Sequence, residues 1–137
     1  MAANGTKPAL PGPLVVIDDE PYALRAMSYL LTREGYEVVT ASNGEEGLQR
    51  VQELRPPLVF LDIMMPQLDG YEVCQRIRSD PSLNGTYIVM LSAKGQQVDR
   101  ERGLAEGANE YMTKPFSPRE VVKRLAEIFG EQRAAES

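Results

Sequence analysis

Leu58-Val59-Phe60-Leu61-Asp62 is the stretch that decides the fold, because four consecutive apolar residues end there on a carboxylate. A continuous apolar run of this length is typical of a strand buried on both faces, as in a parallel sheet covered by helices. Open α/β sheets bind their ligands at the carboxyl ends of such strands. We therefore expect Asp62 at a ligand-binding edge of a parallel sheet.

Three other apolar runs also end in polar residues. The runs and the residues after them are Leu14–Ile17 with Asp18 and Asp19, residues 87–91 with Ser92, and residues 111–112 with Thr113 and Lys114. Because the carboxyl ends of parallel strands meet at one edge of the sheet, these side chains are expected to share a pocket with Asp62. Such a pocket would hold three carboxylates, a hydroxyl group and an ammonium group.

Length and composition point to one globular domain. The chain has 137 residues, 42% hydrophobic and 26% charged, which is ordinary for a soluble domain with its own core. The net charge of −5 argues against a nucleic-acid surface in this chain, since such surfaces normally carry a basic excess. No apolar run is long enough for a membrane span or a signal peptide. The single Cys74 has no partner for an internal disulfide, so we expect a cytoplasmic protein.

The chain contains no histidine. This excludes imidazole bases, histidine metal ligands and the Ser-His-Asp triad. Any chemistry in the pocket must therefore use carboxylates, hydroxyl groups, a lysine or a metal ion.

Strand and helix patterns alternate over residues 13–130, which predicts a parallel sheet with helices on both faces. Val38–Ala41 is expected as a further strand, and Gly130 is expected to cap the last helix. The expected helix starts are Pro21, Ser42 with Glu45, Asp69 with Glu72, and Ser117 with Pro118 and Glu120. Residues 1–12 are expected to be a disordered tail, and residues 131–137 a polar tail or the start of a linker.

The helix expected over residues 96–106 has a weaker pattern than the others. Its apolar face consists of Val98, Leu104 and Ala105, and Gly103 interrupts it. Helices owe most of their stability to the packing of an apolar face, so this helix is expected to be among the least firmly held. Two interpretations remain open at this point, a plain surface helix and a switch.

The three aspartates favour a magnesium site. Mg²⁺ prefers hard oxygen ligands, and a cation would offset the repulsion among Asp18, Asp19 and Asp62. The alternative is that Asp18, Asp19 and Glu20 only cap the helix that follows them. Lys114 would pair with Asp62 or bind a phosphoryl oxygen; alternatively, it is an ordinary surface lysine in a turn.

Such a set of groups allows an aspartate to act as a nucleophile toward phosphorus. Asp62 would attack, a metal ion and Lys114 would neutralise the phosphoryl oxygens, and an acyl phosphate would result. Ser92 would donate a hydrogen bond to an oxyanion, or else it merely ends a strand. Tyr111 is expected as a buried aromatic residue with its hydroxyl group at the surface, a place that requires no function.

Four motifs, in order, resemble the receiver domain of bacterial two-component response regulators. They are Val15-Val16-Ile17-Asp18-Asp19-Glu20-Pro21, Leu61-Asp62-Ile63-Met64-Met65-Pro66-Gln67-Leu68-Asp69-Gly70, Met90-Leu91-Ser92-Ala93-Lys94 and Tyr111-Met112-Thr113-Lys114-Pro115-Phe116. The resemblance covers roughly residues 13–130. It implies a flavodoxin-like, doubly wound sheet of five parallel strands in the order 2-1-3-4-5 with five helices, and a site between strands 1 and 3.

The resemblance also implies roles for the pocket residues. Asp62 would accept a phosphoryl group from a sensor histidine kinase, and Lys114 would contact that group. Asp19, Asp62 and the backbone carbonyl of Met64 would bind Mg²⁺, with Asp18 helping through water.

A switch is implied as well. Ser92 would turn toward the phosphoryl group and Tyr111 would rotate inward. The fourth helix, fifth strand and fifth helix would form the output face for an effector protein or a fused output domain. Under this interpretation the weak helix is a switch, and the chain catalyses only its own phosphorylation and dephosphorylation. A phosphorylation-dependent homodimer through the fourth helix is a further expectation.

Three alternatives fit parts of the pattern. A phosphohydrolase with an aspartyl nucleophile would carry a second acid two residues after Asp62, where this chain has Met64. A flavodoxin-like cofactor module would need a glycine- and hydroxyl-rich loop after the first strand, where the acidic run at Asp18 would repel a phosphate. A phosphorylation-independent receiver-like binding module would not need the complete set of chemical groups.

Overall fold

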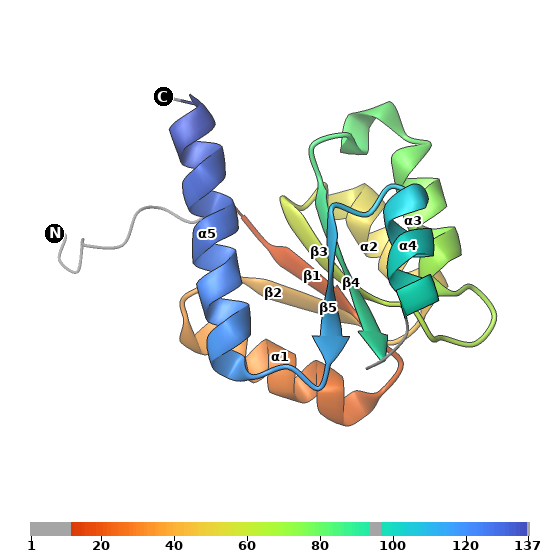
Figure 1. Ribbon diagram of the computed structural model, residues 1–137, viewed down its shortest axis with the longest axis horizontal. Helices are drawn as coiled ribbons and strands as arrows, with labels where there is room; N and C mark the ends of the chain where they lie inside the picture. The colour runs from red at the N-terminus through yellow and green to blue at the C-terminus, as the bar shows by residue number, and fades with distance from the viewer. Residues whose placement is uncertain (1–11, 94–96, 137) are drawn as a thin grey trace, which may run out of the picture.

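The computed structural model describes the backbone of residues 12–93 and 97–136 and the side chains of residues 12–93 and 100–130. Strands and helices alternate along these ranges (Figure 1). The strands are β1 (Leu14–Ile17), β2 (Val38–Ala41), β3 (Leu58–Asp62), β4 (Tyr87–Ala93) and β5 (Glu110–Lys114). The helices are α1 (Pro21–Arg33), α2 (Gly44–Leu54), α3 (Gly70–Arg78), the 3-10 helix η1 (Pro81–Leu83), α4 (Gln97–Ala105) and α5 (Pro118–Glu136).

The five strands form one parallel sheet in the order β2-β1-β3-β4-β5. This confirms the doubly wound fold and the strand order predicted from the sequence. The register pairs Ile17 with Ala41 on one side and with Leu61 on the other. The carboxyl ends of β1 and β3 therefore lie side by side, at the point where the strand order reverses.

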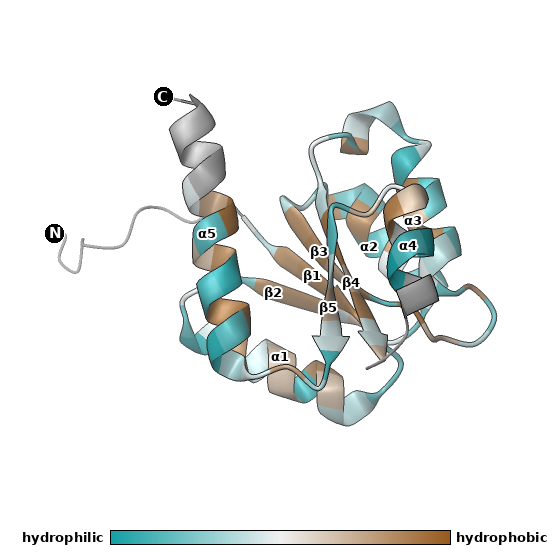
Figure 2. Cartoon of the chain, in the orientation of Figure 1, coloured by the Kyte–Doolittle hydropathy of each residue, from teal (hydrophilic) through white to brown (hydrophobic). Residues whose placement is uncertain are grey.

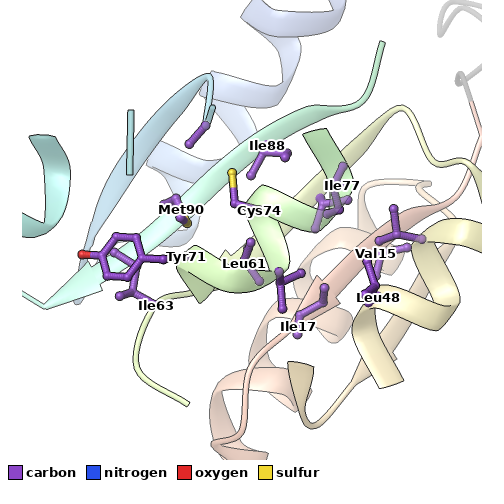
Figure 3. Packing of buried hydrophobic residues seen from close by; sticks show 14 of the residues in the cluster. Val15, Ile17, Leu48, Leu61, Ile63, Tyr71, Cys74, Ile77, Ile88 and Met90 are labelled. Carbon is purple, nitrogen blue, oxygen red and sulfur yellow. The ribbon is translucent and has the colours of Figure 1, made fainter. Parts of the chain in front are cut away.

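Helices cover both faces of the sheet, with α1 and α5 on one face and α2, α3 and α4 on the other (Figure 1). Successive residues of each central strand alternate between two buried clusters, so that Val15 and Ile17 belong to one and Leu14 and Val16 to the other. Strands β1–β4 are hydrophobic along most of their length (Figure 2), and Figure 3 shows the packing of the first cluster. Burial on both faces explains why β3 is a continuous apolar run.

The start of α2 differs from the prediction by one residue. Asn43, rather than Ser42, caps the helix, and its Oδ1 accepts a hydrogen bond from the N–H of Glu46 at 2.8 Å. Glu46 in turn accepts from the N–H of Ser42. The predicted pairing of Ser42 with Glu45 was wrong, because asparagine and serine are equally good caps and acids occupy two successive positions.

The end of α5 also differs from the prediction. The helix continues through Gly130 to Glu136, so the expected cap at Gly130 was wrong. Residues 131–136 are mostly good helix formers, and together they outweigh the roughly 1 kcal/mol that one glycine costs in a helix. Residues 1–11 of the predicted N-terminal tail lie outside the described residues, as does residue 137.

The apolar face of α4 is weak, in line with its sequence. Leu104 is 41% exposed, and the buried Gly103 is packed over the side chain of Met90. The side chain of Val98 lies outside the described residues.

Two arginines supply part of the docking of α4. The guanidinium group of Arg100 lies 4.9 Å from the ring centroid of Tyr111 on β5. The guanidinium group of Arg102 lies 4.0 Å from the ring centroid of Tyr71 on α3. Cation–π contacts on both sides therefore supplement the small apolar contact of this helix.

None of the helices within the described ranges has the length and apolar character that crossing a membrane requires.

Candidate functional site

Three aspartates meet at the carboxyl-end edge of the sheet. Asp18 and Asp19 follow β1, and Asp62 is the last residue of β3. One carboxylate oxygen from each lies within 4.8 Å of the other two. Asp18 and Asp62 are buried, with 1% and 6% of their surface exposed, whereas Asp19 is exposed. The structure thus brings together the three acids that the sequence placed in one pocket.

The loop after β1 assigns different tasks to its three acids. Glu20 caps α1, because its carboxylate accepts hydrogen bonds from the N–H groups of Tyr22 and Ala23. Asp18 orders the turn by accepting from the N–H of Glu20 at 3.0 Å. Glu20 alone therefore serves as the helix cap, whereas Asp18 and Asp19 line the cavity with Asp62.

Lys114 joins two of the acids. It ends β5, and its Nζ donates a hydrogen bond to Asp18 at 2.7 Å and another to Asp62 at 3.3 Å. Burial by itself would lower the pKa of Lys114, but the hydrogen bond to Asp18 and the two negative charges raise it above its usual value. The ammonium group therefore stays charged, and Lys114 is not the ordinary surface lysine of the alternative interpretation. The Lys114–Pro115 peptide bond is cis.

The carboxyl group of Asp62 is a poor acid in this setting. Burial raises its pKa from 3.8 to about 7, and the negative charge of Asp18 acts in the same direction. Lys114 opposes both effects without cancelling them. A further positive charge beside Asp62 would stabilise the ionised form of its carboxyl group. A strongly shifted carboxyl group in a cleft is also typical of functional sites.

The aspartates, Lys114 and Met64 line a cavity of about 730 Å³. Much of the remaining lining comes from α1 and from the connection between β5 and α5. We call the apolar residues of these two segments the apolar wall. It consists of Ala23, Ala26, Met27, Leu30, Phe116 and Pro118. Sequence reasoning missed the wall because Met27 and Leu30 have the spacing of an ordinary core stripe, which gives no local signal of a cavity.

Ser92 and Tyr111 do not belong to the described lining of this cavity. Ser92 is 2% exposed, near the end of β4, and one of its contacts is a hydrogen bond from Oγ to the carbonyl of Ala93. Tyr111 is half-buried beneath the guanidinium group of Arg100. The predicted residues that share the cavity are Asp18, Asp19, Asp62, Met64 and Lys114.

A doubly wound parallel sheet with an acidic pocket at its switch point defines a class of α/β ligand-binding domains. Comparison with known families identifies the member of this class. The model of the response regulator receiver domain matches residues 14–126. The chain therefore belongs to the response regulator receiver domain family and is a receiver domain of a two-component response regulator.

Curated relatives agree with this assignment. The alkaline phosphatase synthesis transcriptional regulatory protein PhoP of Bacillus subtilis is 46% identical over 115 residues, which are 84% of this chain and 47% of that protein. The DNA-binding response regulator MtrA of Mycolicibacterium smegmatis is 41% identical over 112 residues, which are 82% of this chain and 48% of that protein. The chain spans about half the length of these relatives.

Solved structures show the same fold. The chemotaxis protein CheY4 of Vibrio cholerae has a TM-score of 0.79 at 30% identity, and the match covers 85% of this chain and 97% of that chain. A response regulator receiver domain protein from Clostridium thermocellum has a TM-score of 0.80 at 27% identity, covering 90% of this chain and 98% of that chain.

Proposed function

We propose that Asp62 accepts a phosphoryl group from a sensor histidine kinase in a magnesium-dependent reaction. The observation that carries this proposal is the placement of Lys114 and Asp18 around a buried Asp62 carboxylate whose pKa is raised to about 7. The three carboxylates concentrate negative charge beside a cavity. A ligand that binds there together with a cation would offset this charge.

The carboxylate cluster fits Mg²⁺. Its oxygens are hard donors, they lie within 4.8 Å of one another, and Asp19 is open to solvent. Asp19, Asp62 and the backbone carbonyl of Met64 would hold the ion, and Asp18 would assist through water. When bound, Mg²⁺ supplies positive charge that neutralises the oxygens of the phosphoryl group.

Asp62 provides the nucleophile. A carboxylate oxygen attacks phosphorus, the bond from phosphorus to the histidine nitrogen breaks, and an acyl phosphate forms on Asp62. Lys114 lies 3.3 Å from Asp62 and contacts the transferred group as a point charge. Asp18 keeps Lys114 in place through its shorter hydrogen bond. No imidazole is required on this side of the reaction, in keeping with a chain that lacks histidine.

Ser92 and Tyr111 are proposed to report the state of Asp62. Ser92 follows Leu91, whose Cα pairs with that of Asp62 in the sheet. Tyr111 lies on β5 and contacts α4 through Arg100. A change at Ser92 would therefore reach the face formed by α4, β5 and α5, which would bind an effector protein, a fused output domain or a second copy of the chain.

This proposal makes the chain a substrate of the kinase rather than an enzyme for other substrates. It would catalyse only its own phosphorylation and dephosphorylation, in the cytoplasm. An aspartyl phosphohydrolase is disfavoured, because Met64 stands at the cavity where a second acid would be needed.

Intact mass spectrometry after incubation with acetyl phosphate and Mg²⁺ tests the proposal. We expect one phosphoryl group on the wild-type chain and none on Asp62→Asn. Asp80→Asn is a matched control, since Asp80 caps η1 away from the cavity, and it should be labelled like the wild type. An unlabelled wild type, or equal labelling of Asp62→Asn, would refute the assignment.

A further inference from the structure

The cavity at Asp62 is larger than a metal ion and a phosphoryl group require. Its volume of about 730 Å³ lies in the range of pockets that hold whole small molecules. The lining combines the apolar wall with a set of charged side chains. These are four acids and one base, namely Asp18, Asp19, Glu20, Asp62 and Lys114. The proposed phosphoryl transfer uses charged residues and gives the apolar wall no role.

The charges of the lining favour a cationic ligand. The Nζ of Lys114 donates hydrogen bonds to Asp18 at 2.7 Å and to Asp62 at 3.3 Å, so its charge is directed to these two acids. Asp19 lines the same cavity and is exposed to solvent. Because carboxylates outnumber the ammonium group, a further positive charge in the cavity would offset the excess of negative charge.

The apolar wall lies next to the charged residues along the chain. Asp19 stands two residues before α1, which carries Ala23 and Ala26. Lys114 ends β5, and Phe116 follows it by two residues in the connection that passes alongside α1 toward α5 (Figure 1). A ligand that reaches these carboxylates would therefore have the rest of its structure near the wall.

The wall favours an apolar group over a polar one. Its alanine, methionine, leucine, phenylalanine and proline side chains contain no hydrogen-bond donor. A polar group would lose water there without finding a partner, whereas an apolar chain is stabilised by leaving water. The ligand that suits both parts of the lining therefore has a positive charge and an apolar chain.

We propose that the cavity binds a small organic ammonium ion that carries an apolar chain. The ammonium group lies beside the carboxylate of Asp19, and the chain packs against the apolar wall. Binding itself requires neither a metal ion nor phosphoryl transfer. Because the ammonium group and Mg²⁺ would use the same carboxylates, the ligand also inhibits phosphorylation of Asp62, and this consequence alone rests on the proposed function.

Titrations of the ¹⁵N-labelled chain in EDTA, followed by amide chemical shifts, test the inference. Hexylammonium and methylammonium have the same charge and differ in chain length, whereas hexanoate has a similar chain and the opposite charge. Full burial of one methylene favours binding about fourfold. Because Ala26 and Pro118 of the wall are exposed to solvent, we expect hexylammonium to bind only about tenfold more tightly than methylammonium. Hexanoate should not bind at the same concentrations.

Variants locate the two parts of the ligand. Ala26→Gln adds a polar side chain to the wall, and Phe116→Ala removes its largest side chain. Each should lower the ratio of the hexylammonium affinity to the methylammonium affinity toward one. Asp19→Asn should weaken both ammonium ions, because it removes the exposed carboxylate. Thr32→Gln is the matched control, since Thr32 is an exposed residue of α1 outside the cavity lining and should keep the wild-type affinities.

The outcomes separate this inference from the proposed function. A ratio near one in the wild type, or a high ratio that persists in both wall variants, would overturn the inference and leave the phosphoryl-acceptor role intact. Binding of hexanoate as tight as that of hexylammonium, or unchanged affinities in Asp19→Asn, would overturn it as well, because the charge would then have no part in recognition. Selective binding of hexylammonium to a chain that acetyl phosphate does not label would support the site and remove the proposed function.

Discussion

Lys114 lies closer to Asp18 than to Asp62, with distances of 2.7 and 3.3 Å from its Nζ to the two carboxylates. One ammonium group is thus shared unequally between two buried acids. Asp62 receives the weaker compensation, and its pKa stays raised at about 7. Asp18 holds the ammonium group of Lys114 through the shorter hydrogen bond, whereas Asp62 accepts the longer one.

Loss of the ammonium group should impair phosphoryl transfer. Lys114→Gln removes the point charge beside Asp62, and we expect the rate of labelling by acetyl phosphate to fall roughly a hundredfold, as for the removal of one oxyanion-stabilising donor. Lys123→Gln, at an exposed position of α5, is the control and should keep the wild-type rate. Initial rates from intact mass spectra measure both variants. A rate for Lys114→Gln within twofold of the wild type would contradict the role of this lysine.

Ionisation of Asp62 should destabilise the metal-free fold. The pKa of Asp62 in the folded chain is about 7, above the ordinary aspartate value of 3.8 that applies to the unfolded chain. The contribution of protonated Asp62 to the free energy of unfolding is therefore fully present below about pH 4 and is lost as the pH rises through 7. Asp62→Asn removes the charge, so in EDTA the variant should melt above the wild type at pH 8. The difference in Tm should shrink at pH 4. The same difference at both pH values would show that ionisation of Asp62 is not its cause.

Magnesium should stabilise the chain through the carboxylate cluster. Binding to the folded state alone contributes about 1.4 kcal/mol at a Mg²⁺ concentration ten times Kd, which a thermal melt detects as a higher Tm. Asp19→Asn removes an exposed carboxylate of the cluster with little expected effect on the fold, and it should weaken this shift. Asp80→Asn should retain it. NaCl at matched ionic strength controls for screening, and an undiminished shift in Asp19→Asn would argue against the site.

The fold and the acids of the site were predictable for one physical reason. Strands buried on both faces are continuous apolar runs, and the carboxyl ends of parallel strands meet at one edge of the sheet. The apolar run of residues 58–61 therefore predicted a buried parallel strand, and Asp62 directly after it predicted the location of the site. The choice between Ser42 and Asn43 as a helix cap was not predictable, because the two side chains cap equally well. The ends of the strands depend on backbone pairing with neighbouring strands as well as on the apolar pattern. Ser92, which follows the apolar run, pairs with Thr113 of β5 and so belongs to β4.

Contacts between side chains that are distant in the sequence could not be predicted from local sequence patterns. The unequal sharing of Lys114 depends on the positions of two carboxylates on different strands. The exposure of Met27 and Leu30 to a cavity depends on where the β5–α5 connection passes. Periodicity identifies the face of a helix that turns inward, but it does not show whether that face meets the sheet or an open space.

The cluster of Glu110, Arg124 and Tyr87 should contribute to stability at neutral pH. Arg124 donates hydrogen bonds to both carboxylate oxygens of Glu110, including one of 2.6 Å, and the hydroxyl group of Tyr87 also donates to Glu110. Burial by itself would raise the pKa of Glu110, but the hydrogen bonds from Arg124 and Tyr87 lower it below 4.5. The stabilisation is therefore present above about pH 4.5 and is lost as the pH falls through the lowered pKa.

Glu110→Gln should lower the free energy of unfolding by about 1 kcal/mol at pH 7, and the difference from the wild type should narrow at low pH. Urea unfolding at several pH values measures it. Glu127→Gln is the control, because Glu127 is exposed and its contact with Arg124 is a 3.4 Å pair on the helix surface, which contributes little. A difference that does not depend on pH would contradict the assignment to this carboxylate.

The two arginine contacts should determine how firmly α4 is held. Arg102→Gln removes the guanidinium group that lies 4.0 Å from the ring of Tyr71, while glutamine retains a similar helix propensity. A cation–π contact of about 0.5–1 kcal/mol at an exposed site corresponds to a two- to fivefold faster opening-limited exchange. Hydrogen exchange of amides 101–105 should therefore accelerate by about that factor, whereas exchange in β3 should not change. Arg76→Gln, at an exposed position of α3, should leave α4 unaffected. Unchanged exchange of α4 in Arg102→Gln would show that its packing over Met90 is sufficient to hold the helix.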